Sequence, residues 1–170
     1  MRSIVFNNCI DLENITRLIY SLELHKNEKI KLYFSTWGGE SALADVLIDY
    51  INSRSSDIEL VCFGGIQSAG FSILMSTNCE KEILDTCWGM AHKGKFIIYS
   101  KFLRIFPNKS VKYKQKLAKA ENDKFLKKCK CVGILENKLK NIHEGKDVYF
   151  NNDEMKYLFN NKIKKVKINE

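Results

Sequence analysis

Ile58-Glu-Leu-Val-Cys-Phe-Gly-Gly-Ile-Gln-Ser-Ala-Gly70 is the stretch of sequence that decides the fold. Residues 58–63 form a short apolar run rich in β-forming residues, which is typical of a buried strand. Gly64 and Gly65 are expected to end this strand, because a glycine pair interrupts regular structure. Residues 68–77 are apolar or small and predict a helix. Ser68 therefore falls where a buried strand gives way to a helix.

The segments on both sides of this stretch alternate between strand-like and helix-like patterns. The expected elements are helices over residues 12–25, 40–53, 112–143 and 153–159, and strands over residues 29–35, 81–84, 88–91 and 162–168. This alternation predicts an α/β layered domain with parallel strand pairing. Because no internal repeat or linker interrupts the chain, we expect a single domain over residues 1–170.

Composition places the chain among ordinary globular proteins. It has 170 residues, of which 45% are apolar and 28% are charged, a balance that is typical of a folded domain. No apolar run approaches the roughly 18 to 20 residues of a membrane span. The start, Met1 to Asn8, lacks the apolar stretch of a secretory signal. We therefore expect a cytoplasmic protein that does not contact a membrane.

Six cysteines are present, and most lie in apolar or helical segments. Cys62 and Cys87 adjoin large apolar residues, and a small buried thiol is common in such places. Cys129 and Cys131 flank Lys130, but no second pair at zinc-ligand spacing accompanies them. We expect reduced thiols, with no disulfide, no metal and no organic cofactor.

The net charge of +8 is unevenly distributed along the chain. Residues 91–140 hold 15 Lys and Arg against 3 Asp and Glu, and the remainder is mildly acidic. Two interpretations stay open: a long solvated helix in a Lys-rich protein, or a surface for an anionic partner. Nucleic acid is not the expected partner, because few aromatic residues are spaced for base stacking.

The residues around Ser68 carry groups that acyl transfer requires, namely a nucleophile and amide donors for an oxyanion. The amide of Ala69 faces the same space as a serine at the helix start, and Gly38-Gly39 offers amides on a backbone without side chains. A serine at a helix start is also a common N-cap. A glycine pair is a common turn, and His92 is compatible with a structural role. From these residues alone, both interpretations remain open.

Three segments resemble motifs of the Clp protease proteolytic subunit. Thr36-Trp-Gly-Gly-Glu-Ser41 is similar to its Ser-Pro-Gly-Gly-Ser segment. Gly64-Gly-Ile-Gln-Ser-Ala-Gly70 is similar to its Gly-x-Ala-Ala-Ser-Met-Gly nucleophile segment. Trp88-Gly-Met-Ala-His92 resembles the strand that ends in the family's catalytic histidine. The three segments occur in the family's order and near its spacing.

The resemblance implies a serine endopeptidase that hydrolyses peptide bonds with a Ser–His–Asp triad. Ser68 would be the nucleophile and His92 its general base. Asp147 matches the family's third position, shortly before an aromatic residue, and Asp153 and Glu144 are its rivals.

Four further positions take roles from the same motifs. Gly38 and Ala69 would supply the oxyanion-hole amides. Gly39 and Lys93 would lie along a substrate bound as an extended strand. Trp37 departs from the family's pattern, because it stands where the family has proline.

The resemblance also implies architecture and partners. The expected fold is a ClpP/crotonase-like layered fold with a parallel sheet, flanking helices and a protruding handle helix within residues 100–143. The expected partners are a polypeptide substrate and further copies of the chain in stacked rings. Docking of an AAA+ ATPase is left open, because we expect no counterpart of the family's N-terminal axial loops.

Two other functions remain open. The first is another acyl-transferring member of the crotonase-like fold, such as an acyl-CoA hydratase or a signal-peptide peptidase. The second is a catalytically inactive scaffold whose basic segment binds nucleic acid or another anion. Covalent labelling of Ser68 would distinguish a serine hydrolase from a hydratase, and steep salt dependence would mark an anion-binding surface.

Overall fold

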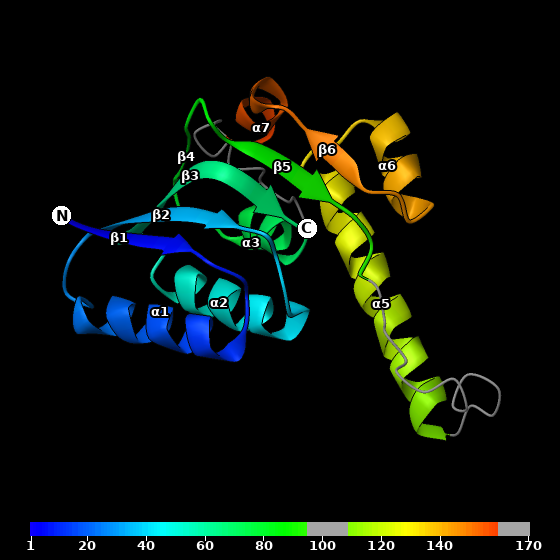
Figure 1. Cartoon of the computed structure of the whole chain (residues 1–170), viewed down its shortest axis with the longest axis horizontal. Helices are drawn as coiled ribbons and strands as arrows, with labels where there is room; N and C mark the ends of the chain where they lie inside the picture. The colour runs from blue at the N-terminus through cyan, green and yellow to red at the C-terminus, as the bar shows by residue number, and fades with distance from the viewer. Residues whose placement is uncertain (95–108, 160–170) are drawn as a thin grey trace, which may run out of the picture. The chain divides into compact units, whose positions relative to one another are not determined.

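The computed structural model of the chain describes residues 1–94 and 109–159 (Figure 1). The chain divides into two compact units. The first, here called the core unit, comprises Met1–Ala91 and the C-terminal segment from Val148, and the second, the insert unit, is His92–Asp147.

Among the described residues, the core unit builds one six-stranded sheet. Its strands are β1 (Arg2–Asn7), β2 (Ile30–Thr36), β3 (Ile58–Gln67), β4 (Lys81–Ile83), β5 (Trp88–Ala91) and β6 (Val148–Phe150). The order is β1-β2-β3-β5-β6, and β4 also pairs with β3. All pairs are parallel except β5 with β6. The α/β fold with a parallel sheet is thus confirmed.

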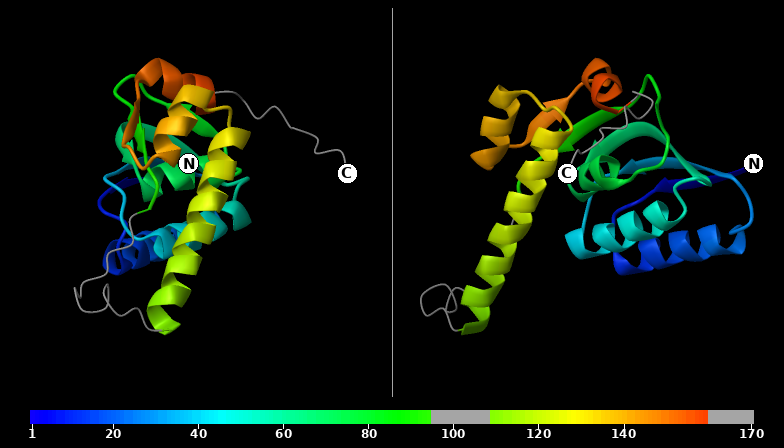
Figure 2. Two further views of the ribbon diagram at one scale, coloured as in Figure 1. Left: turned by 90° about the vertical axis from the view of Figure 1, so that its right-hand side faces the viewer. Right: turned by 180° about the vertical axis from the view of Figure 1, so that it is seen from behind.

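Helices α1 (Leu12–Leu24) and α2 (Ser41–Ser53) cover one face of the sheet and lie side by side in both views of Figure 2. Their sequences place apolar residues on one stripe each, which buries Leu22 and Leu47 completely. Asp11 caps α1, because its Oδ1 accepts a hydrogen bond from the Asn14 amide at 2.8 Å. Two shorter helices also belong to the described part of this unit, α3 (Ala69–Ser76) and α7 (Asn152–Phe159).

Strand β3 runs through the glycine pair, so the prediction that Gly64 and Gly65 end it was wrong. Gly64 has φ +57°, and the opposite strand shifts register between Phe34 and Thr36. The glycines therefore bend the strand instead of ending it. Before the bend β3 pairs with β4, and after it β3 pairs with β5. This exchange of partners brings the end of β5 next to Ser68.

Three further elements differ from the sequence-based expectations. Strands β1 and β6 were not predicted: β1 mixes polar with apolar residues, and β6 has only three residues. The prediction of a single long helix over residues 112–143 was also wrong. In its described part, the insert unit has two helices, α5 (Lys109–Cys131) and α6 (Glu136–His143), separated by Gly133 at φ +88°. The strand expected over 162–168 lies outside the described residues.

All six cysteines are free thiols, and four of them are buried. Burial raises the pKa of Cys87 and of Cys129 to about 12 and raises that of Cys62 as well, because a thiolate is poorly solvated there. Cys9 and Cys131 are exposed. No helix within the described residues is long and apolar enough to cross a membrane.

We expect a thiol reagent at neutral pH to modify only Cys9 and Cys131 in the native protein, because reaction requires an accessible thiolate. Counting modified cysteines by mass spectrometry checks this, and unfolding in denaturant should bring the count to six. Modification of Cys87 at the rate of Cys9 in the folded protein would contradict the packing described here.

Candidate active site

Ser68 occupies a strained turn between β3 and α3. Its φ is +52° and its ψ is −116°, and no other non-glycine residue among those described has a positive φ. Its side chain makes no capping hydrogen bond to α3, so the N-cap interpretation does not account for it. Such a conformation costs on the order of 1–3 kcal/mol, and it persists where the surroundings enforce it.

Two neighbouring segments enforce this turn. The Ser68 amide donates to the Met90 carbonyl at 2.8 Å, which extends the β3–β5 pairing by one residue. On the other side, Thr36 packs against the turn. A Cβ at Gly70 would lie 2.2 Å from Thr36 Cγ2, so only glycine fits there. The turn is therefore held between the ends of β2 and β5.

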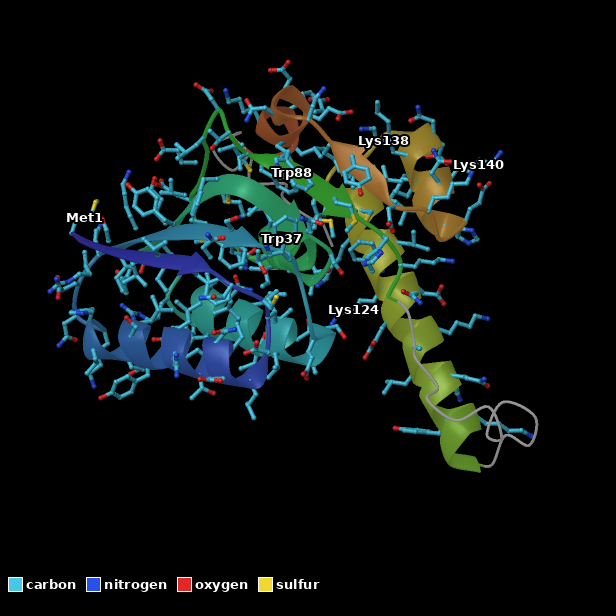
Figure 3. All side chains as sticks on the ribbon, viewed as in Figure 1. Met1, Trp37, Trp88, Lys124, Lys138 and Lys140 are labelled. Atoms are coloured by element: carbon cyan, nitrogen blue, oxygen red, sulfur yellow. The ribbon has the colours of Figure 1, made fainter. Side chains whose placement is uncertain are left out.

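Gly38 approaches Ser68 closely, as the sequence predicted for these two motifs. A Cβ at Gly38 would lie 2.7 Å from Ser68 Cβ and 2.8 Å from the Gln67 carbonyl oxygen, and Gly38 has φ +91°. Gly39 is fixed from behind by a bridge to Ile10, whose amide donates to the Gly38 carbonyl at 2.9 Å. Trp37, labelled in Figure 3, is 69% exposed beside this pair.

The two proposed oxyanion donors differ in their present partners. The Ala69 amide belongs to the first turn of α3, where amides have no acceptor within the helix. The Gly38 amide donates to Thr36 Oγ1 at 3.0 Å, and that hydroxyl donates to the Asn8 carbonyl at 2.7 Å. Gly38 would therefore have to open or share this bond in order to bind an oxyanion.

Sequence reasoning missed the role of Thr36. A threonine two residues before a glycine is the signal that was available, because Ser and Thr hydroxyls often accept from the amide two positions on. Thr36 is only 1% exposed, so both of its hydroxyl bonds are shielded from water.

We expect Thr36→Val to lower the free energy of unfolding by about 1–3 kcal/mol, because it leaves the Gly38 amide and the Asn8 carbonyl without this partner. Urea denaturation followed by circular dichroism measures the change. Thr77→Val is the matched control, since the buried Thr77 hydroxyl donates to the Ile73 carbonyl within its own helix. An equal or larger loss in the control would refute the special role of Thr36.

In the insert unit, His92 and Asp147 are paired. His92 Nδ1 lies 2.9 Å from Asp147 Oδ1. Because a carboxylate only accepts, this contact places the ring proton on Nδ1 and leaves Nε2 as the acceptor. The side chain of His92 is 18% exposed and that of Asp147 is 44% exposed. The pair has the orientation that a general base and its positioning carboxylate require.

Glu144 and Asp153, the two alternatives to Asp147 as the third triad residue, have other surroundings. Glu144 pairs with Lys146 at 2.7 Å. Asp153 lies in the first turn of α7, where an acidic residue stabilises the helix dipole. Asp147 is therefore the carboxylate that the structure brings to His92.

The segment after His92 is tied to α5 by a second residue that the sequence did not reveal. The Asn122 side chain bonds both backbone groups of Gly94: Oδ1 accepts from the amide at 2.8 Å, and Nδ2 donates to the carbonyl at 3.4 Å. Lys93 is half-buried between His92 and Gly94. No group of three His, Cys, Asp or Glu within the described ranges is arranged to hold a metal ion.

Comparison with known proteins agrees with this description. A sequence model of the family described as Clp protease matches residues 2–128. A mutant of ClpP1 from Listeria monocytogenes has a similar structure, with a TM-score of 0.67 and 18% sequence identity over 92% of this chain and 86% of that chain. No curated protein matched the sequence.

The fold is therefore the mixed α/β fold of ClpP-like proteins. The chain belongs to the Clp protease family.

Proposed function

We propose that this chain is a serine endopeptidase in which Ser68, His92 and Asp147 form the catalytic triad. The observation that carries the proposal is the backbone of Ser68, a strained serine that is held against Gly38 and the end of β5. Structural serines have no need of such a conformation, and strained residues of this kind cluster at functional sites.

Chain connectivity supports the inclusion of His92. The Met90 carbonyl accepts a hydrogen bond from the Ser68 amide, and Met90 precedes His92 by two residues. On the neighbouring strand, Val148 pairs with Ala91, so the chain reaches Asp147 and His92 from two paired residues of the core unit. The hydrogen-bonded pair of His92 and Asp147 then supplies a base with a fixed tautomer.

In the proposed mechanism, Ser68 Oγ attacks the peptide carbonyl carbon and passes its proton to His92 Nε2. Asp147 stabilises the resulting imidazolium. The C–N bond breaks, and the proton moves from His92 to the leaving amine. Water then repeats the attack on the acyl ester, again through His92, and releases Ser68 with the carboxylic acid product.

The oxyanion of each tetrahedral intermediate would bind the amides of Ala69 and Gly38. The Ala69 amide is available at the start of α3, whereas the Gly38 amide would exchange its Thr36 partner for the oxyanion. The substrate backbone would follow the segments after Gly39 and around Lys93 as an added strand. Assembly into stacked rings and a cytoplasmic location belong to the same proposal.

Fluorophosphonate labelling of the purified chain tests the nucleophile, because the reagent forms a covalent bond only with an activated serine. We expect one adduct, localised by mass spectrometry to Ser68, and none in Ser68→Ala. Ser72→Ala is a suitable control, because Ser72 lies one turn further along α3 and should label as the parent does. A folded parent without an adduct, or an adduct at another serine, would overturn the proposal.

A further inference from the structure

Trp37 places a large apolar side chain in solvent next to the proposed oxyanion hole. The residue is 69% exposed, whereas Thr36 and Gly38 on either side of it are buried. The backbone at this point is fixed, because the Gly38 amide donates to Thr36 Oγ1 at 3.0 Å and so closes a turn around Trp37. The indole is therefore attached to a rigid support, and packing within the chain does not explain why a tryptophan stands there.

Glu40, on the other side of the glycine pair, is a second exposed side chain with no internal role. It directly precedes α2, but its carboxylate makes no capping hydrogen bond to that helix. None of the ion pairs formed within residues 1–94 and 109–159 involves Glu40. Its backbone is fixed as well, since its amide donates to the Ile10 carbonyl at 2.9 Å.

Both side chains begin close to the proposed nucleophile. A Cβ at Gly38 would lie 2.7 Å from Ser68 Cβ, and Trp37 is one peptide link from Gly38. Consecutive Cα atoms are about 3.8 Å apart, so the Cα atoms of Trp37 and Glu40 are separated by at most about 11 Å. Glu40 also begins the segment along which the substrate is proposed to run. A long side chain of a substrate residue next to the scissile bond can therefore reach both groups.

The charge around the glycine pair is negative. Residues 32–53 contain three acidic residues and residues 3–16 contain two, and neither range has a Lys or an Arg. Asp11 adjoins Ile10, which is bridged to Gly39, so a second carboxylate stands beside this pair. The starts of α1 and α2 contribute about half a positive charge each, which the two carboxylates outweigh. The local potential therefore favours a cation over an anion.

We propose that Trp37 and Glu40 form a subsite for an arginine side chain of the substrate, at a residue next to the scissile bond. The guanidinium would stack on the indole face and donate hydrogen bonds to the Glu40 carboxylate. A neutral apolar side chain would also cover Trp37, but it would desolvate Glu40 without pairing it. This inference rests on the proposed peptidase function and specifies its substrate class.

Competition between two peptides in one reaction tests the subsite. The peptides differ at one residue, which is arginine in one and citrulline, its neutral isostere, in the other. The pair is moved through the two positions on each side of the scissile bond. Because both peptides compete for the same enzyme, the ratio of their kcat/KM values does not depend on how much of the full chain is folded or assembled. We expect a ratio of about tenfold in favour of arginine at one position.

Variants of the two residues should change this ratio. Trp37→Ala and Glu40→Gln should each lower it to about threefold or less, whereas Trp37→Phe should keep most of it, because a phenyl ring also offers a face to the cation. Tyr20→Ala and Asp45→Asn are the matched controls, an exposed aromatic residue and an exposed carboxylate elsewhere in the core unit, and they should leave the ratio unchanged. Glu40→Lys should invert the charge preference, so that a peptide with glutamate at this position is cleaved faster than one with glutamine.

Binding to Ser68→Ala separates the subsite from the peptidase function. Fluorescence anisotropy of the labelled peptides should show about tenfold tighter binding of the arginine peptide than of the citrulline peptide. Adding Trp37→Ala or Glu40→Gln should remove the difference. If the parent cleaves no peptide and this binding difference is present, the peptidase function is wrong and the subsite is supported.

Three outcomes would overturn the subsite. Cleavage without a preference for arginine over citrulline at any of the four positions would do so and would leave the peptidase function intact. The same holds if the preference is undiminished in both Trp37→Ala and Glu40→Gln. Equal binding of the two peptides by Ser68→Ala, together with a parent that cleaves neither, would remove the subsite and the peptidase function alike.

Discussion

Peptide turnover is expected to fall by about 10⁶-fold in His92→Ala and by about 10⁴-fold in Asp147→Asn. His92 would carry the proton in both half-reactions, so its removal disables the nucleophile entirely. The substituted asparagine side chain would still occupy the space, but an amide does not select the Nδ1–H tautomer that the 2.9 Å contact now fixes. The loss should therefore be smaller, though still large.

Turnover of a fluorogenic peptide by parent and variants measures this difference. Glu144→Gln and Asp153→Asn are the matched controls, since both remove a nearby carboxylate that has other surroundings. They should retain turnover within about threefold, because distant sites act independently. A loss in Glu144→Gln as great as in Asp147→Asn would show that the third position of the triad had been assigned to the wrong residue.

Gly38→Ala is expected to abolish measurable labelling of Ser68 and to destabilise the fold. The positive φ of Gly38 alone costs a residue with a Cβ about 1–3 kcal/mol. The added methyl group would also overlap Ser68 Cβ and the Gln67 carbonyl, and overpacking of this kind costs about 1–3 kcal/mol more. Displacement of the nucleophile by about 1 Å costs about 10²-fold in rate.

Gly133→Ala isolates the effect of contact from that of backbone strain. Gly133 has φ +88°, close to the +91° of Gly38, but a Cβ there would meet nothing within 4 Å. Both variants should therefore carry the conformational cost, and only Gly38→Ala should lose labelling. Urea denaturation and the rate of fluorophosphonate labelling give the two quantities. Similar labelling rates in the two variants would refute the close approach of Gly38 to Ser68.

Much of the core unit could be predicted from the sequence, because its strands and helices have strong apolar patterns. The stripes of α1 and α2 and the buried run at the start of β3 indicated those elements directly. The bend in β3 could not be predicted in the same way. Whether Gly64 and Gly65 end or bend a strand depends on the partners β2, β4 and β5, which local sequence does not specify.

The candidate site was predicted more completely by motif spacing than by residue patterns. Contacts among Gly38, Ser68 and Ala69 were expected, and so was the pairing of His92 with Asp147. Thr36 and Asn122 were missed because each acts through backbone hydrogen bonds. The division of the basic helix at Gly133 was missed because lysines on both sides continue a helix-forming composition.

The antiparallel pairing of β5 with β6 holds the two ends of the insert together. Ala91 pairs with Val148, and just beyond them His92 is joined to Asp147. The entropy of closing a loop grows only logarithmically, by about 0.6 kcal/mol for each doubling of length. The β5–β6 pairing can therefore tolerate large changes in the length of the segment that it closes. Residues 95–146 can therefore change in length and charge during evolution at little thermodynamic cost, while the proposed base His92 and its carboxylate Asp147 remain paired.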